Sequence, residues 1–286
     1  KPLLALLLVE SGAADRFNLT DREIALACAS HNGEAGHVEA VLKWLATIGL
    51  SVDDLECGAQ MPSREPAQRA VILSGKAPTP AHNNCSGKHT GFLSAARHLG
   101  LPTKGYIQYE HPVQQRLLGI LEQMSGCELG NVPRGTDGCG IPTIAFPIAN
   151  HAFAMAQLAD PHHLPEARAA AARRILPAMR AEPWYVAGTG RFCTKVMEVT
   201  GAKAAIKTGA EGVYMGALPD LGLGICVKAA DGAGRASEVA MGAVLRLLGV
   251  IDEADAAKLH ATLEPEIRNW AGTVTGRIVP GDAPRF

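Results

Sequence analysis

The chain has 286 residues, of which 47% are hydrophobic and 19% are charged, and its formal net charge is -1. These values are typical of a globular protein with a substantial core, in one large domain or two tightly packed lobes, and we expect a single domain over residues 1–286. Basic residues are scattered rather than clustered, which argues against a nucleic acid, an anionic membrane or another polyanion as the partner.

The chain begins with a dense apolar run over 3–9, which indicates the middle of a buried helix. The run is too short to span a bilayer and lacks the flanks and cleavage pattern of a signal peptide. Thr20 and Glu23 form a capping-box pattern, so we predict a helix over 21–29 that delivers Ser30 at its end. A second helix is predicted over 34–48, because Gly49 follows as a stop.

The middle of the chain also favours helices. Pro78 and Pro80 exclude a helix over 78–84, and Ser86 is placed to cap a helix over 86–99 that carries Lys88 and His89 in its first turn. Apolar periodicity predicts further helices. They cover 112–125, 150–159, 166–180 and 191–199.

The pattern changes after Gly201 to short runs separated by glycines, at 203–207, 212–218 and 222–229, and a helix is predicted over 237–248. Three successive short strands indicate an antiparallel meander. We therefore expect an α/β fold, specifically an α/β/α sandwich in which helices cover both sides of an antiparallel sheet, with Lys207 at the accessible end of a strand.

The seven cysteines, an odd number without tight framework spacing, favour a reduced, cytoplasmic protein.

Three segments carry the chemistry expected of a serine and lysine acyl-transfer site. Such sites combine S-x-x-K on a helix, then S-x-N, then K-[ST]-G on a strand. Ser30-His31-Asn32 and Lys207-Thr208-Gly209 match the last two, and Lys1 falls where the lysine of S-x-x-K belongs. The serine of that first motif would then lie three residues before Lys1, so we expect the chain to be a fragment.

A serine hydroxyl is a weak nucleophile until a base takes its proton, and a lysine can do so when burial or nearby cations leave its amine neutral. Ser30 and Lys207 can pair only through the fold, because they are remote in sequence. On the residues alone, Lys207 is equally compatible with a solvated lysine at a strand edge.

A second set of residues is compatible with a metal site. Cys85 and Cys139 are potential thiolate ligands for zinc, but no C-x-x-C pair is present, and buried inert thiols are the commoner fate of cysteine. Lys88 would lie at a helix N-terminus, which disfavours its positive charge, and His89 is a more conventional third ligand.

Several blocks of the sequence resemble those of the thermolabile, rhizobial-type (class 3) L-asparaginases. The resemblance covers nearly the whole chain. The blocks are 28–34 (CASHNGE), 56–58 (ECG), 82–89 (HNNCSGKH), 111–114 (HPVQ), 137–142 (DGCGIP) and 207–212 (KTGAEG).

The resemblance implies a serine β-lactamase-like fold, similar to penicillin-binding proteins, a homodimer, and hydrolysis of L-asparagine to L-aspartate and ammonia. It implies two Ser-Lys pairs, one containing Lys1 and the other formed by Ser30 and Lys207. It makes the serine expected three residues before Lys1 the nucleophile, and Ser30 is the alternative nucleophile. It also implies a zinc site beside the active site, with Cys85, Lys88 and Cys139 as ligands and Asp137 as a neighbouring acid.

By resemblance to β-lactamases, the oxyanion donors would be the N–H of the nucleophile itself and the N–H of Ala210. Asn32 and Asn84 are candidates for holding the polar ends of the substrate. The zinc would fix the wall of the pocket, since Ser-Lys chemistry already supplies a nucleophile.

Four alternatives remain open at the level of sequence. A glutaminase differs by one methylene in its substrate, a discrimination of only about 1–3 kcal/mol. A β-lactamase or peptidase shares the three triplets, a zinc hydrolase would use a metal-bound water, and an inactive homologue would bind asparagine without releasing ammonia.

Overall fold

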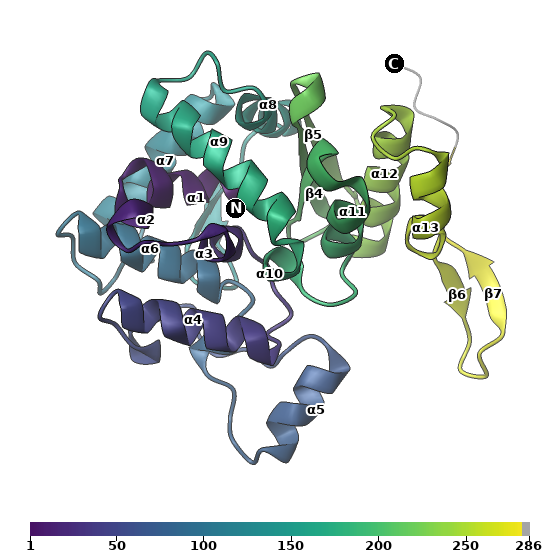
Figure 1. Cartoon of the computed structure of the whole chain (residues 1–286), viewed down its shortest axis with the longest axis horizontal. Coiled ribbons are helices and arrows are strands. Elements are labelled where there is room, and N and C mark those ends of the chain that lie inside the picture. The colour runs from purple at the N-terminus through teal and green to yellow at the C-terminus, as the bar shows by residue number, and fades with distance from the viewer. Residues whose placement is uncertain (282–286) are drawn as a thin grey trace.

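The computed structural model describes residues 1–281, and the prediction of one domain over 1–286 therefore extends beyond them. Helices dominate, with short antiparallel strands concentrated in the second half of the chain (Figure 1). The helices are α1 Pro2–Glu10, α2 Ala13–Arg16, α3 Asp21–Ala27, α4 Ala35–Thr47, α5 Glu65–Leu73, α6 Ser86–His98, α7 Pro112–Ser125, α8 Ile148–Ala159, α9 Glu166–Ala181, α10 Pro183–Ala187, α11 Phe192–Thr200, α12 Gly234–Leu247 and α13 Glu253–Leu263. The strands are β1 Arg134–Thr136, β2 Pro142–Ile144, β3 Ala205–Thr208, β4 Val213–Leu218, β5 Leu223–Lys228, β6 Glu266–Arg268 and β7 Val274–Arg277.

The central sheet has the antiparallel order β3-β4-β5. Side chains alternate along a strand, and the register places Lys207 on the same face as Gly224. A Cβ on Gly224 would lie 2.0 Å from Ala152 O, so α8 approaches this face as closely as only glycine allows. Tyr214 points to the opposite face, where its hydroxyl lies 3.0 Å from Cys193 Sγ of α11. The sheet thus has helices on both faces, and the Lys207 side chain lies on the face that α8 covers.

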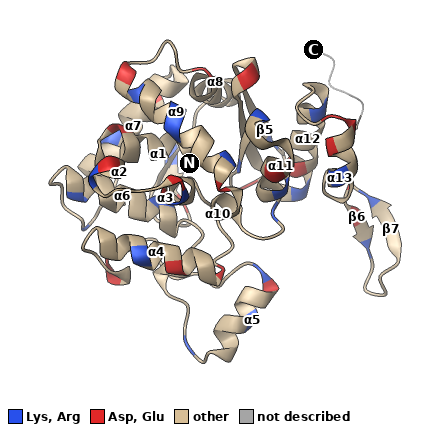
Figure 2. Ribbon diagram, viewed as in Figure 1, with Lys and Arg blue, Asp and Glu red and all other residues tan. Residues whose placement is uncertain are grey.

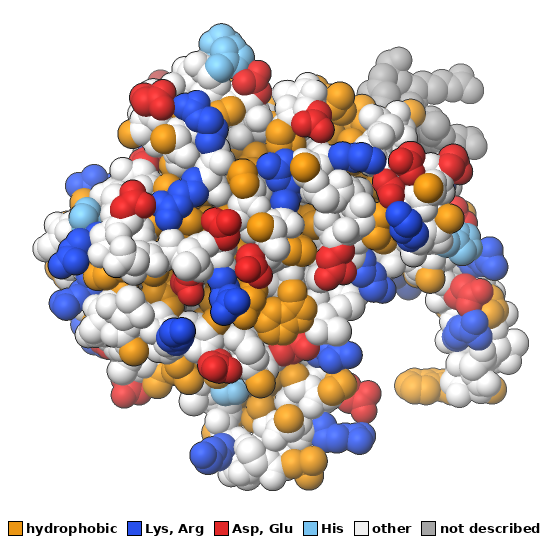
Figure 3. All heavy atoms as spheres, in the orientation of Figure 1, with side chains coloured by type: hydrophobic (Ala, Val, Ile, Leu, Met, Phe, Trp, Pro, Cys, Tyr) orange, Lys and Arg blue, Asp and Glu red, His pale blue; other side chains and the backbone are white. Residues whose placement is uncertain are grey.

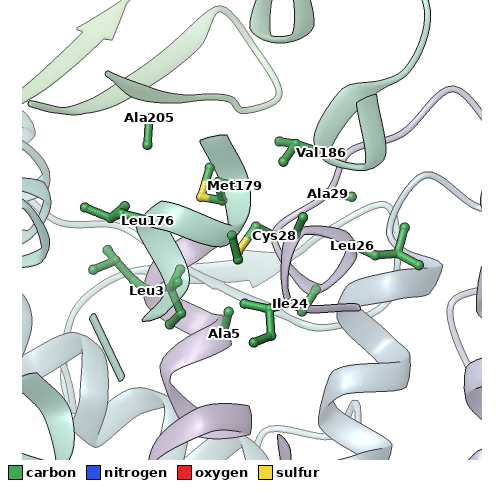
Figure 4. Packing of buried hydrophobic residues seen from close by; sticks show 14 of the residues in the cluster. Leu3, Ala5, Ile24, Leu26, Cys28, Ala29, Leu176, Met179, Val186 and Ala205 are labelled. Carbon is green, nitrogen blue, oxygen red and sulfur yellow. The ribbon is translucent and has the colours of Figure 1, made fainter. Parts of the chain in front are cut away.

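Helix α1 is the centre of the helical part. Its apolar residues surround the whole helix, and seven of its nine residues are buried, because α6, α7 and α9 pack around it. Figure 4 shows Leu3 and Ala5 near Ile24 of α3 and Leu176 of α9, in a cluster that continues toward Ala205 of β3. Burying each leucine stabilises the fold by about 1.5–3 kcal/mol. Lys1 stands at the N-cap of this helix and is therefore carried into the interior.

Helix α6 crosses α3 at very short range. A Cβ on Gly87 would lie 2.3 Å from Leu26 O, so glycine is required for the two helices to approach in this way. The contact brings Cys85 and Lys88, at the start of α6, close to the segment that follows α3. That segment contains Ser30.

The three predicted strands and their antiparallel pairing are confirmed, as are the predicted helices, with ends shifted by a few residues. The chain is a mixed α/β protein with small antiparallel sheets, in agreement with the expected α/β class. The sequence did not predict α2, α5, α10, α13 or the hairpins β1-β2 and β6-β7. Figure 1 shows α5 and the hairpin β6-β7 projecting from the body, and Trp270, between the two strands of this hairpin, is fully exposed.

Charged residues of both signs are interspersed along the chain (Figure 2) and over the face drawn in Figure 3. This agrees with the absence of a basic cluster in the sequence. Within residues 1–281, none of the helices has the length and apolar character needed to cross a membrane.

Candidate active site

Ser30 is held in a fixed position by the backbone on either side of it. Its own N–H donates to Val186 O at 3.0 Å, and the next N–H, of His31, donates to Asn84 O at 3.1 Å. The Nε2 atom of His31 lies 2.9 Å from Ser86 Oγ, and its Nδ1 accepts from Gly33 N. The segment after α3 is therefore tied both to α10 and to the start of α6.

Two lysines meet at the Ser30 hydroxyl. Lys207 Nζ lies 2.8 Å from Ser30 Oγ, and Lys1 Nζ lies 2.6 Å from the same oxygen and 2.8 Å from Ala29 O. Lys207 also donates to Thr208 O at 2.6 Å. The structure thus brings together the three residues that the sequence assigned to catalysis.

Lys207 is buried, and burial together with the nearby charge of Lys1 lowers the pKa of its ammonium from 10.5 to about 7. Arg191 acts in the same direction. At neutral pH a substantial fraction of the Lys207 side chains is therefore neutral. A neutral amine at hydrogen-bond distance from a serine hydroxyl is able to accept its proton.

Sulfur and amine groups form a second cluster directly beside Lys1. Cys85 Sγ lies 3.0 Å from Lys1 Nζ, Lys88 Nζ lies 3.0 Å from Cys139 Sγ, and Cys85 is hydrogen-bonded to Cys139. That hydrogen bond lowers the pKa of Cys85 and raises the pKa of Cys139, which favours the charged form at Cys85 over Cys139. Burial opposes the charge of Lys88, but the two sulfur groups outweigh it and raise its pKa.

The donor set of this cluster is two sulfurs and one amine. It contains no third cysteine, histidine or carboxylate: the described residues include no group of three or more His, Cys, Asp or Glu side chains placed to hold a metal ion. His89 has a different neighbour, because its Nδ1 lies 2.8 Å from Tyr106 OH. Two cysteine sulfurs and a nitrogen are nevertheless ligands that suit zinc.

The side-chain amide of Asn32 forms hydrogen bonds to several separate segments of the chain. Its Nδ2 donates to Glu34 Oε1 and Thr189 O, both at 3.1 Å, while its Oδ1 accepts from Ser63 and Arg191, both at 3.2 Å. These four bonds fill both N–H groups and both lone pairs of the amide. Asn32, expected from the sequence to hold the substrate, is thus placed to hold Arg191.

The other predicted substrate residues have less crowded surroundings. The Asn84 side chain makes no hydrogen bond to another residue of the described part, and neither does the N–H of exposed Ala210. Asp137 accepts from Cys139 N at 3.3 Å and lies close enough to Lys88 to raise its pKa.

Sequence reasoning missed Arg191 and Glu34. Glu34 accepts from both the N–H and the hydroxyl of Thr189, at 2.8 Å each, and fastens the loop before α11 beside Asn32. The only local signal is the pair of glycines, Gly188 and Gly190, which marks a special turn directly before Arg191.

A family model described as L-asparaginase II matches residues 1–280. A comparison with curated proteins found no match. The family match agrees with the rhizobial-type L-asparaginase resemblance of the sequence blocks.

Proposed function

The chain belongs to the L-asparaginase II family and is an L-asparaginase, a hydrolase that acts on a linear amide, and we propose that it works by Ser-Lys chemistry at Ser30. The observation that carries this proposal is the meeting of Lys1 and Lys207 at Ser30 Oγ. The substrate of an asparaginase is the small molecule L-asparagine, and the products are L-aspartate and ammonia.

In the proposed first step, neutral Lys207 accepts the proton of Ser30 Oγ as this oxygen attacks the side-chain amide carbon of the substrate. The C–N bond then breaks, and the proton returns to the leaving nitrogen, which departs as ammonia. Lys1, which touches the same oxygen, stabilises negative charge there. Water hydrolyses the resulting ester and releases aspartate.

The developing oxyanion needs hydrogen-bond donors. The N–H of Ser30 is already bonded to Val186 O, which leaves it less suited to this role than the β-lactamase resemblance implied. We assign the role to the N–H of Ala210 and the side-chain amide of Asn84, which make no hydrogen bond within residues 1–281. Asp137 is proposed to act beside the site through Lys88.

We further propose the serine β-lactamase-like fold. Its support is the position of Lys207-Thr208-Gly209 at the end of an edge strand, on the sheet face that points toward the helical part. A cytoplasmic location is proposed because all seven cysteines are free thiols, five of them buried.

We propose a zinc site formed by Cys85, Lys88 and Cys139. The contacts among these three side chains support it, although Lys88 must lose its proton to serve as a ligand, which a bound cation would favour. When bound, zinc would fix the wall of the substrate pocket. The reaction itself rests on Ser30 and the lysines.

A homodimer is also proposed. The fully exposed Trp270 lies on a projecting hairpin, with Ile267 and Val274 exposed nearby, and such apolar surface is typical of an interface.

The test is ammonia release by the purified protein from L-asparagine and L-glutamine, with and without a chelator. We expect turnover of L-asparagine that a chelator weakens but does not abolish, and its loss in Lys207→Met. Faster release from L-glutamine would favour a glutaminase, and abolition by the chelator would favour a metal-bound water. Binding of asparagine without ammonia release would indicate an inactive homologue. Covalent labelling by a fluorescent penicillin would indicate a β-lactamase or peptidase.

A further inference from the structure

We propose that Arg191 is the residue that binds the α-carboxylate of the substrate, and that Asn32 is the positioning residue that aims it. This inference rests on the proposed function, because it concerns the substrate of the same site. It goes beyond the Ser-Lys chemistry because it names the residue that recognises the α-carboxylate, a group that other primary amides lack.

The first observation is that Arg191 is anchored beside Ser30. Its guanidinium donates to Asn32 Oδ1 at 3.2 Å, and Asn32 follows Ser30 by two residues, so their Cα atoms are at most about 7 Å apart. Arg191 also lowers the pKa of Lys207, as a cation within electrostatic range of its amine does. The guanidinium therefore belongs to the same site as the reacting hydroxyl.

The second observation is that no carboxylate neutralises Arg191. It forms no ion pair within residues 1–281, and its hydrogen-bond partner is a neutral amide. Glu34 is occupied by Thr189 and lies 3.6 Å from Arg64, while Glu238 influences Arg191 only through longer-range electrostatics. Arg191 is half-buried and stands at the N-cap of α11, where the helix dipole disfavours a cation.

The third observation is the sign of the surrounding charge. Lys1 and Lys207 meet at the Ser30 hydroxyl, and Arg191 adds a permanent positive charge at the neighbouring Asn32. A guanidinium that has no anionic partner attracts an anionic ligand. The planar fork of arginine matches a carboxylate by two parallel hydrogen bonds, and one amide contact leaves other N–H groups of Arg191 free for it.

Asparagine has the matching chemistry. Its reactive amide and its α-carboxylate lie at opposite ends of a short aliphatic chain, so a carboxylate held by Arg191 orients the amide carbon toward Ser30 Oγ. Asn32 supports this arrangement, because Glu34 and Thr189 fix its N–H groups and leave Oδ1 pointing at Ser63 and Arg191.

The test compares L-asparagine with 3-aminopropanamide, which keeps the amine and the amide but lacks the carboxylate. In Arg191→Met we expect kcat/KM for L-asparagine to fall about 10²–10³-fold, mainly through KM, and kcat/KM for 3-aminopropanamide to change less than about threefold. Arg191→Lys, which keeps the charge without the fork, should give an intermediate loss. Arg64→Met is the matched control from the same network and should affect both substrates alike.

Equal losses on both substrates in Arg191→Met would overturn the inference and leave the proposed function standing. Calorimetric binding of L-aspartate and β-alanine, which differ only by the α-carboxylate, provides a readout without turnover. Loss of L-aspartate binding in Arg191→Met, with no ammonia released even by the wild type, would instead sink the proposed function and keep the inference. Retained L-aspartate binding in a folded Arg191→Met protein would overturn the inference.

Discussion

Lys207 Nζ lies 2.8 Å from Ser30 Oγ, although 177 positions separate the two residues in the chain. Burial and the charge of Lys1 set the pKa of Lys207 at about 7. Below this pH the amine is protonated and cannot accept the serine proton, and above it the amine is a base. We therefore expect kcat/KM for L-asparagine to rise with pH through about 7, as measured by initial rates of ammonia release. A rate that does not change across this range would contradict the role of Lys207 as the base.

Ser30→Ala removes the oxygen on which both lysines converge. We expect kcat to fall by at least about 10³-fold with the melting temperature nearly unchanged. Each lysine keeps a backbone carbonyl as acceptor, and no other side chain of residues 1–281 bonds to this hydroxyl. The matched control is Ser94→Ala, since Ser94 is buried in α6 and donates only to Thr90 O. Similar activity of the two variants would exclude Ser30 as the nucleophile.

Cys139→Ala removes one sulfur of the proposed zinc site. We expect the bound zinc, measured by elemental analysis, to be lost, and KM to rise more than kcat falls, because the metal is assigned to the pocket wall. Cys127→Ala is the control, since this half-exposed thiol has no part in the cluster. Unchanged zinc content and substrate affinity in Cys139→Ala would remove the metal proposal.

Gly188 and Gly190 both have a positive φ, of 105° and 78°, but only Gly188 faces close neighbours. A Cβ on Gly188 would lie 2.7 Å from both Asn32 Nδ2 and Glu34 Oε1, whereas a Cβ on Gly190 meets nothing. Both alanine variants place a side chain at a positive φ and are strained for that reason. Because of the additional clash, we expect Gly188→Ala to lower the free energy of unfolding by about 1–3 kcal/mol more than Gly190→Ala does. Denaturant titration measures this difference. Equal losses would show that the loop is not clamped against Asn32.

Trp270→Ala tests the projecting hairpin as an interface. We expect a weaker dimer by sedimentation equilibrium, because a fully exposed tryptophan is a strong candidate for a buried anchor in an assembly. Ile72→Ala, on the exposed face of α5, is the comparison. An assembly state that neither concentration nor Trp270→Ala alters would contradict the proposed role of the hairpin.

The sequence predicted the elements that have a strong burial pattern. Helix α1 is apolar on every side and the strands β3 to β5 are separated by glycines, so both were recognised. Helix α5 has no buried residue, so no packing against the core marks it as a helix. Contacts between residues far apart in the chain were the second kind of feature that could not be predicted from the sequence. The bonds of Asn32 to Thr189 and Arg191 and of Ser30 N to Val186 O join segments more than 150 positions apart, and no local pattern encodes them.

All hydrogen-bonding groups of the Asn32 side-chain amide are in use, and this affects how the loop before α11 can open. Glu34 and Asn32 together hold Thr189 through its N–H, its hydroxyl and its carbonyl oxygen, so the loop before α11 cannot open by breaking one bond at a time. Its opening must be one cooperative event that also releases Arg191. In amide hydrogen exchange, the Thr189 N–H should therefore exchange at a rate shared with neighbouring protected amides of this loop, as a single unit that ligand binding slows.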